Sequence, residues 1–144
     1  MSSSRDPLGR EAEIRRLVGD WIAKADLDFD AVIRLVAEER FRDIVAFHAQ
    51  QSSEKYLKAL LTQHQVEFPK THVIRRLLIL LDPVEPGLAK KLDDANWLSP
   101  FGAEIRYPGD RPQTVPGDEV RAQQLAQKVR EAVMTLLGPY LSEA

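Results

Sequence analysis

The stretch from Phe41 to Gln65 contains neither glycine nor proline and is rich in residues with high helix propensity. Apolar residues recur through it at helical spacing, and it ends just before Phe68-Pro69. A period near 3.6 also dominates the rest of the chain, and no segment alternates apolar and polar residues between hairpin turns. The sequence therefore predicts an all-α fold, an up-and-down helical bundle of about five helices.

The first helix is expected from about Leu8 to Glu39, because apolar residues recur at helical spacing throughout this range. A short third helix is expected to start at a Thr71 cap and to end at Asp82-Pro83, since the residue before a proline is pushed out of the α region. A fourth segment begins near Pro86 and is expected to be broken or distorted around residues 100–102.

The last helix is expected from about Asp118 to Gly138-Pro139, a combination that commonly ends helices. Before it, residues 106–117 contain three prolines and two glycines, so this stretch is predicted to be a loop.

Length and composition favour one soluble domain over residues 1–144, with residues 1–7 expected to be flexible. The 144 residues include no cysteine, which excludes thiolate catalysis, cysteine-type zinc sites and disulfides. The longest aliphatic run, residues 77–81, is far below the roughly 20 residues that span a bilayer. A net charge of -2 argues against a surface that attracts nucleic acid everywhere. We therefore expect a cytoplasmic protein with no membrane association.

No metal or cofactor is expected from the motifs. Asp26, Asp28 and Asp30 alternate as in a calcium loop, but the loop glycine and the final glutamate are missing. The three histidines show none of the spacings typical of helical metal sites. Phosphate-binding loops, nucleophile elbows and dinucleotide fingerprints are also missing from the sequence.

One face of the second predicted helix is polar. A projection at 100° per residue places its members within about 80° of one another, and we call this face the polar strip: His48, Gln51, Lys55, Lys58 and Thr62. Two ammonium groups about one turn apart suit a phosphate, and the histidine or glutamine can bond a base or ribose. The alternative is an ordinary Glu54–Lys58 pair on a solvent-exposed helix face.

Three other residues are candidates for ligand binding. His72 follows the predicted Thr71 cap and is expected in the first turn of the third helix, where backbone N–H groups attract anions. Arg106 and Tyr107 are adjacent at a helix–loop junction. The guanidinium of Arg106 can donate two hydrogen bonds to a phosphate, and Tyr107 adds an aromatic ring beside it. Alternatively, His72 packs locally, Tyr107 closes the core and Arg106 pairs with a carboxylate such as that of Glu104.

Three blocks of the sequence, in this order and spacing, resemble the HEPN domain family (higher eukaryotes and prokaryotes nucleotide-binding). The first is Trp21-x-x-Lys24-Ala25-x-x-Asp28-x-x-Ala31. The second is Phe47-His48-Ala49-Gln50-Gln51-x-x-Glu54-Lys55-x-x-Lys58-Ala59-Leu60-Leu61, followed by Pro69-Lys70-Thr71-His72. The third is Arg106-Tyr107-Pro108 before the final amphipathic helix. The resemblance implies a helical homodimer, often paired with a minimal nucleotidyltransferase in a toxin–antitoxin-like two-component system.

Many HEPN proteins are metal-independent ribonucleases that use an arginine and a histidine four to six residues apart near the later helices. No histidine follows Arg106 here. Arg42 and His48 have five residues between them, but they lie in another block and about 120° apart on a straight helix. The resemblance therefore favours the non-catalytic, nucleotide-binding branch of the family.

Three functional hypotheses follow. The first is a nucleotide- or RNA-binding module that acts with a partner protein and performs no chemistry itself. The second is a ribonuclease toxin in which two chains bring His48, His72 or Arg106 together. The third is a structural adaptor in which only the helical faces matter.

Overall fold

The computed structural model describes residues 7–103, 109–110 and 112–143. In chain order, the elements in this part of the chain are α1 (Pro7–Leu35), the 3-10 helix η2 (Glu39–Phe41), α2 (Arg42–Gln63), α3 (Ile74–Leu81), α4 (Leu88–Lys91), the 3-10 helix η3 (Asp93–Gly102) and α5 (Asp118–Ser142). Strands are absent from the described residues. The predicted all-α bundle is confirmed.

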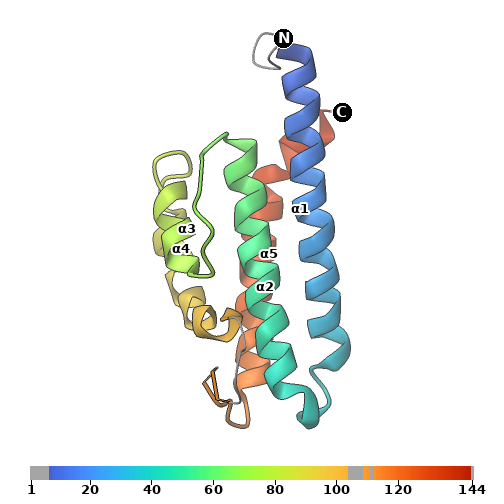
Figure 1. The fold of residues 1–144 in the computed structure, drawn as a ribbon, viewed down its shortest axis with the longest axis vertical. Coiled ribbons are helices and arrows are strands. Elements are labelled where there is room, and N and C mark those ends of the chain that lie inside the picture. Colours follow the sequence, from blue (N-terminus) through green and yellow to red (C-terminus); the bar gives the residue numbers. More distant parts are fainter. Residues whose placement is uncertain (1–6, 104–108, 111, 144) are drawn as a thin grey trace.

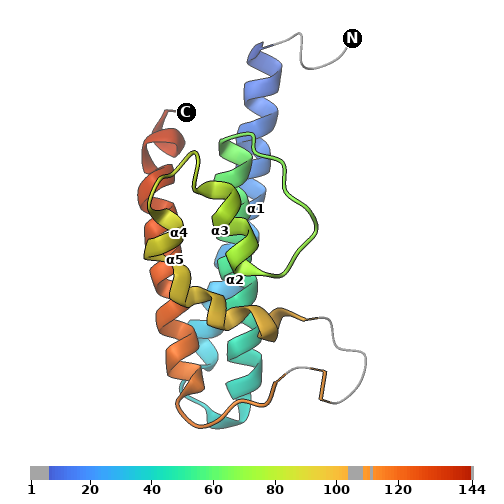
Figure 2. The same cartoon turned by 90° about the vertical axis from the view of Figure 1, so that its left-hand side faces the viewer.

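Three long helices run side by side, with α2 between α1 and α5 (Figure 1). The chain descends through α1, ascends through α2 and ascends again through α5, so that the N-terminal end of α1 and the C-terminal end of α5 lie at the same end of the bundle. A strap formed by residues 64–73 leads from the end of α2 to α3. The short helices α3, α4 and η3 then cover the side of α2 away from α1 (Figure 2).

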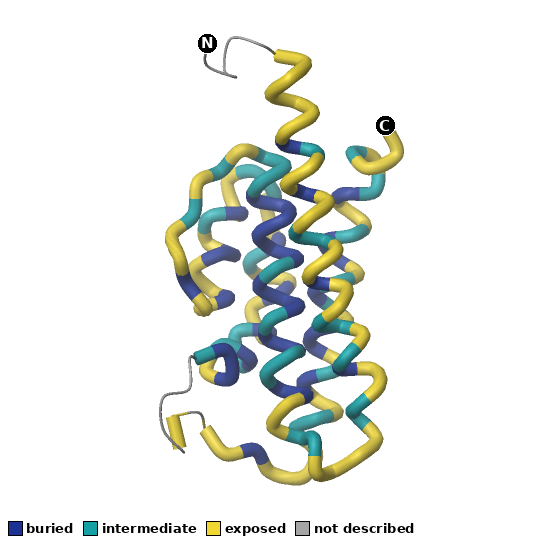
Figure 3. Tube along the Cα trace, turned by 45° about the vertical axis from the view of Figure 1, so that its right-hand side comes forward, coloured by how far each residue is buried: buried dark blue, intermediate teal, exposed yellow. Residues whose placement is uncertain are grey.

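Helix α2 is buried on most of its circumference because small residues let its neighbours approach closely. Ala46, Ala49, Ser53 and Ala59 have no exposed surface. Ser52 and Ser53 direct their hydroxyl groups to the carbonyl oxygen of Ala49, so burial leaves neither of them unsatisfied. In Figure 3 α2 is coloured mainly as buried or intermediate, whereas the first turns of α1 are exposed. Polar groups on α2 are therefore enclosed by other elements.

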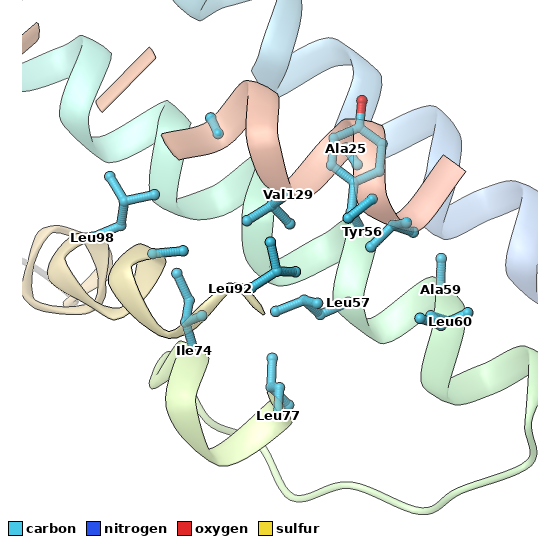
Figure 4. Packing of buried hydrophobic residues seen from close by; sticks show 14 of the residues in the cluster. Ala25, Tyr56, Leu57, Ala59, Leu60, Ile74, Leu77, Leu92, Leu98 and Val129 are labelled. Atoms are coloured by element: carbon cyan, nitrogen blue, oxygen red, sulfur yellow. The ribbon is translucent and has the colours of Figure 1, made fainter. Parts of the chain in front are cut away.

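The apolar core extends from the long helices to the short ones. Three residues have no exposed surface: Leu57 of α2, Leu92 directly after α4, and Val129 of α5. They gather with Ile74 and Leu77 of α3 (Figure 4). No helix in the described ranges combines the length and the apolar composition needed to cross a bilayer.

The ends of α1 differ slightly from the prediction. The helix begins at Pro7, which was expected in a flexible segment, because the fixed φ of proline suits the first helical position. It ends at Leu35 rather than near Glu39, because a turn and η2 reverse the chain there before α2 begins. The fourth segment forms α4 and then η3, which contains Pro100 and ends at Gly102.

The prediction that α5 ends at Gly138-Pro139 is wrong, because the helix continues to Ser142. A proline in a helix removes one backbone hydrogen bond. Here contacts with α1 hold the last turn: Arg15 donates to the carbonyl oxygen of Tyr140 at 2.7 Å, and its guanidinium lies 4.2 Å from the centre of the Tyr140 ring. These tertiary contacts outweigh the local signal.

Candidate functional site

The structure describes five of the seven residues predicted for the site: His48, Gln51, Lys55, Lys58 and His72. Arg106 and Tyr107 lie outside the described residues. The first four lie on α2, whose unbroken helical geometry places them on one face. His72 lies in the strap. The structure connects these side chains through two carboxylates, which divide them into two clusters.

The first group, which we call the Asp28 cluster, consists of Asp28, His48 and Lys55 and lies between α1 and α2. His48 Nδ1 is 2.8 Å from Asp28 Oδ1, and Lys55 Nζ donates to Asp28 Oδ2 at 2.5 Å. Only 12% of the Asp28 side chain is exposed, against 30% for His48 and 21% for Lys55. The carboxylate is therefore the most deeply buried member of the cluster, and the side chains of His48 and Lys55 lie nearer the solvent.

The charge of Asp28 is stabilised by its partners. Burial raises the pKa of its carboxyl, but the hydrogen bonds from His48 and Lys55 outweigh burial and hold the pKa below its usual value. An ionised Asp28 fixes Lys55 in one position and binds His48 through Nδ1. The other ring nitrogen of His48, Nε2, has no hydrogen-bond partner among the described residues.

The second group, the Glu54 cluster, consists of Glu54, Lys58, Gln50, Gln51 and His72. Lys58 Nζ donates to Glu54 Oε2 at 2.8 Å, while Gln50 Nε2 at 3.0 Å and His72 Nδ1 at 2.8 Å share Glu54 Oε1. Gln50 Nε2 also donates to the backbone carbonyl of His72 at 2.9 Å, and Gln51 donates to Gln50 Oε1 at 2.7 Å. The cluster therefore joins α2 to the strap.

The Glu54–Lys58 pair does not lie on a solvent-exposed helix face, contrary to the alternative drawn from the sequence. The pair forms at the expected i,i+4 spacing, but its two side chains are only 5% and 9% exposed. The rings of Trp21 and Phe68 lie 5.5 and 5.6 Å from Lys58 Nζ and cover it. Burial raises the pKa of Glu54, but hydrogen bonds from Lys58, Gln50 and His72 outweigh it and lower the pKa overall.

His72 does not lie in the first turn of α3. That helix begins at Ile74, so His72 belongs to the strap and 55% of its side chain is exposed. The first backbone N–H groups of α3 are already occupied, because Ile74 N donates to Ser99 Oγ and Arg75 N donates to Asn96 Oδ1, each at 2.9 Å. Side chains of η3 cap α3, which the sequence did not reveal, and these amides are not available to an anion.

Arg42 and His48, the pair with ribonuclease-like spacing in the sequence, have different partners. Arg42 Nε donates to Thr114 Oγ1 at 2.9 Å, and its Nη1 donates to Glu39 at 3.3 Å. The Thr114 hydroxyl in turn donates to Asp43. Arg42 therefore anchors the segment before α5 to the start of α2, while His48 binds Asp28.

Sequence reasoning missed a third polar group that joins the long helices. Tyr56 of α2 is buried, and its hydroxyl donates to Asp26 Oδ1 of α1 at 2.5 Å and accepts from Arg130 Nε of α5 at 3.1 Å. Burial and the neighbouring Asp26 carboxylate raise the pKa of Tyr56. Because all of its members are bonded to one another, this group holds α1, α2 and α5 together.

The site residues predicted from the sequence do not include three members of the two clusters: Asp28, Gln50 and Glu54. Spacing within α2 signals the Glu54–Lys58 pair, but no local pattern joins Asp28 to residues 20 and 27 positions later. In the described part of the chain, no three or more histidine, aspartate or glutamate side chains form a group suited to a metal ion.

The fold and the two clusters define a small all-α module with a partly enclosed row of polar groups along its central helix. The model of the HEPN domain family matches residues 18–138, which is most of the chain. The chain belongs to the HEPN domain family, as the three sequence blocks indicated, and it is a nucleotide- or RNA-related helical module. No curated protein and no solved structure gave a significant match.

Proposed function

We propose that this HEPN module binds a nucleotide or the backbone of RNA along the polar strip and acts with a partner protein without performing chemistry itself. One observation carries the proposal: Asp28 holds Lys55 and His48 in fixed positions while both remain partly exposed. Side chains positioned before binding lose less conformational entropy when a ligand arrives. Lys55 has three N–H donors, of which Asp28 takes one, so a phosphate can accept from the others.

Arg106 and Tyr107 complete the proposed site, with a bidentate fork for the phosphate and a ring for the base or sugar. The end of η3 supports this assignment. Gly102 lies against the side-chain amide of Gln50, so the described segment that precedes residue 104 ends beside the Glu54 cluster. Gln51 and His72 lie in the same cluster and supply further hydrogen-bonding groups.

The binding proposal is tested with fluorescein-labelled oligouridine and with ATP, by fluorescence anisotropy and competition. Lys55→Ala is expected to weaken binding about tenfold, the loss typical of one charge-assisted hydrogen bond, without lowering helicity. Arg106→Lys keeps the charge but removes the planar fork, and is expected to cost about 1–3 kcal/mol of binding free energy. Lys58 is left unchanged in these variants because its removal would leave Glu54 buried without its main partner.

Lys24→Ala is the matched control, because Lys24 is an exposed lysine of α1 with no ion pair to any described carboxylate. Its binding is expected to equal that of the wild-type protein. The proposal fails if neither probe binds at low salt, or if Lys24→Ala weakens binding as much as Lys55→Ala does.

A metal-independent ribonuclease is the second candidate, and one observation favours it. His48 and His72 each contact a carboxylate through Nδ1, an arrangement that orients imidazoles for general acid–base catalysis. Cleavage of the oligouridine in EDTA, lost in both His48→Ala and His72→Ala, would establish this activity. Saturable binding without cleavage supports the binding module. If the protein shows neither binding nor cleavage, the structural adaptor is the remaining hypothesis.

We further propose that two copies of this chain form a homodimer. This homodimer acts with a different protein, a minimal nucleotidyltransferase, in a toxin–antitoxin-like pair. The long helices leave several large apolar residues exposed: Leu17, Leu27, Ile33, Ile44 and Leu136. Burying part of this apolar surface against a second copy removes it from water. Sedimentation velocity at micromolar concentration is expected to show a dimer, and a monomer throughout that range would contradict the proposal.

A further inference from the structure

The outer side of α3 and α4 concentrates positive charge in an otherwise acidic chain. Residues 70–91 contain five lysines or arginines and two carboxylates, a net charge of +3, whereas the whole chain carries -2. Four of these cations, Lys70, Arg76, Lys90 and Lys91, are exposed and form no ion pair with any carboxylate in the described residues. This charge lies on the side of α2 away from α1 (Figures 1 and 2).

An exposed apolar ridge lies within this basic region. Ile79 projects from α3 and is 61% exposed. It borders two hollows, one of about 330 Å³ between α3, α4 and η3, and one of about 210 Å³ beside Pro69 in the middle of the strap. Leu78 and Ala89 line the larger hollow, and Leu80 lines the smaller one. We call this surface the Ile79 ridge.

Cations stand at the edges of both hollows. Arg75, Lys90 and the carboxylate of Asp93 line the larger hollow, and Arg76 lines the smaller one. Arg75 is paired with Asp93 at 3.0 Å, so Arg76 and Lys90 are the cations left for a partner, one on each hollow. An apolar centre with an unpaired cation on either side complements an apolar ligand face that is bordered by carboxylates.

We infer that the Ile79 ridge is a docking surface for an acidic amphipathic helix of another protein, a role separate from the polar strip. Apolar side chains one turn apart on such a helix straddle Ile79 and enter the two hollows, as ridges pack into grooves. Carboxylates beside them meet Arg76 and Lys90. Nucleic acid fits this surface less well, because its bases stack on aromatic rings and neither hollow is lined by one.

The test uses a fluorescein-labelled peptide of about 15 alanine, glutamate and leucine residues, with the leucines on one helical face. Fluorescence anisotropy with the full chain is expected to show saturable binding at low salt. The double variant Arg76→Glu/Lys90→Glu is expected to weaken binding at least about tenfold by reversing the complementary charges. Ile79→Ser is expected to weaken it about tenfold by removing the apolar ridge.

Controls separate docking from general charge attraction and from misfolding. Lys24→Glu and Leu8→Glu alter exposed residues of α1 and are expected to leave peptide binding unchanged, while circular dichroism and thermal unfolding confirm that each variant is folded. A peptide of the same composition in shuffled order is expected to bind at least about tenfold more weakly, because it lacks a continuous apolar face. The inference is overturned if the shuffled peptide binds equally well, if charge reversal has no effect, or if oligouridine displaces the peptide from wild-type protein.

Discussion

Glu54→Leu is expected to reduce the free energy of unfolding by about 3–5 kcal/mol, the usual loss when one partner of a buried ion pair is removed. The change leaves Lys58 charged and almost fully buried, and it also removes the acceptor used by Gln50 and His72. The measurement is urea unfolding followed by circular dichroism.

The double variant Glu54→Leu/Lys58→Met replaces both charges with apolar side chains, and we expect it to recover more than half of the stability lost in Glu54→Leu. Asp30→Leu is the matched control: it removes the carboxylate of an exposed i,i+4 pair with Arg34 and is expected to change stability little. If Asp30→Leu and Glu54→Leu cost the same, burial of the Glu54 cluster does not contribute as described.

The Glu54 carboxylate also makes the free energy of unfolding of the wild-type protein depend on pH. Because the pKa of folded Glu54 lies below its ordinary value of 4.5, its contribution is complete above pH 4.5 and is lost as the pH falls through the lower folded pKa. In Glu54→Gln this part of the pH dependence is missing. Urea unfolding at a series of pH values should therefore show a flatter curve for the variant, and the two curves should converge at low pH.

Gly102→Ala is expected to reduce the free energy of unfolding by about 2–4 kcal/mol, because it displaces a buried amide that makes several hydrogen bonds. A Cβ atom at position 102 would lie 2.1 Å from both Cδ and Oε1 of Gln50. To avoid it, Gln50 must give up its bonds to Glu54, Gln51 and the His72 carbonyl. Loss of these bonds also loosens the strap from α2.

Gly19→Ala provides the opposite control. Gly19 lies inside α1, and apart from its chain neighbours and the adjoining helix backbone, no atom lies within 4 Å of the position where its Cβ would be. Alanine has the higher helix propensity, so this variant is expected to gain about 0.5–1 kcal/mol. Equal stability of Gly102→Ala and the wild-type protein would show that Gln50 is not held as the hydrogen bonds indicate.

The sequence by itself determined the helices and the face on which the polar residues of α2 lie. A helix relates residues three and four positions apart, so the periodicity and the lack of glycine and proline in residues 41–65 were sufficient to predict α2 and the polar strip. The three blocks that resemble the HEPN family also lie within the 18–138 match. The sequence wrongly predicted that α5 ends at Gly138-Pro139, because contacts with Arg15 maintain the helix beyond Pro139.

Only the tertiary structure decided which charges meet and which are buried. Asp28 reaches His48 and Lys55 because α1 packs along α2, and the strap together with Trp21 encloses the Glu54–Lys58 pair that spacing alone allows on an exposed face. Side chains of η3 likewise occupy the start of α3. These partners lie 18 to 37 positions apart in the chain, so their contact depends on how helices pack and connect. Within a helix or turn, side chains contact one another only when they are about three or four positions apart, so local periodicity does not predict these contacts.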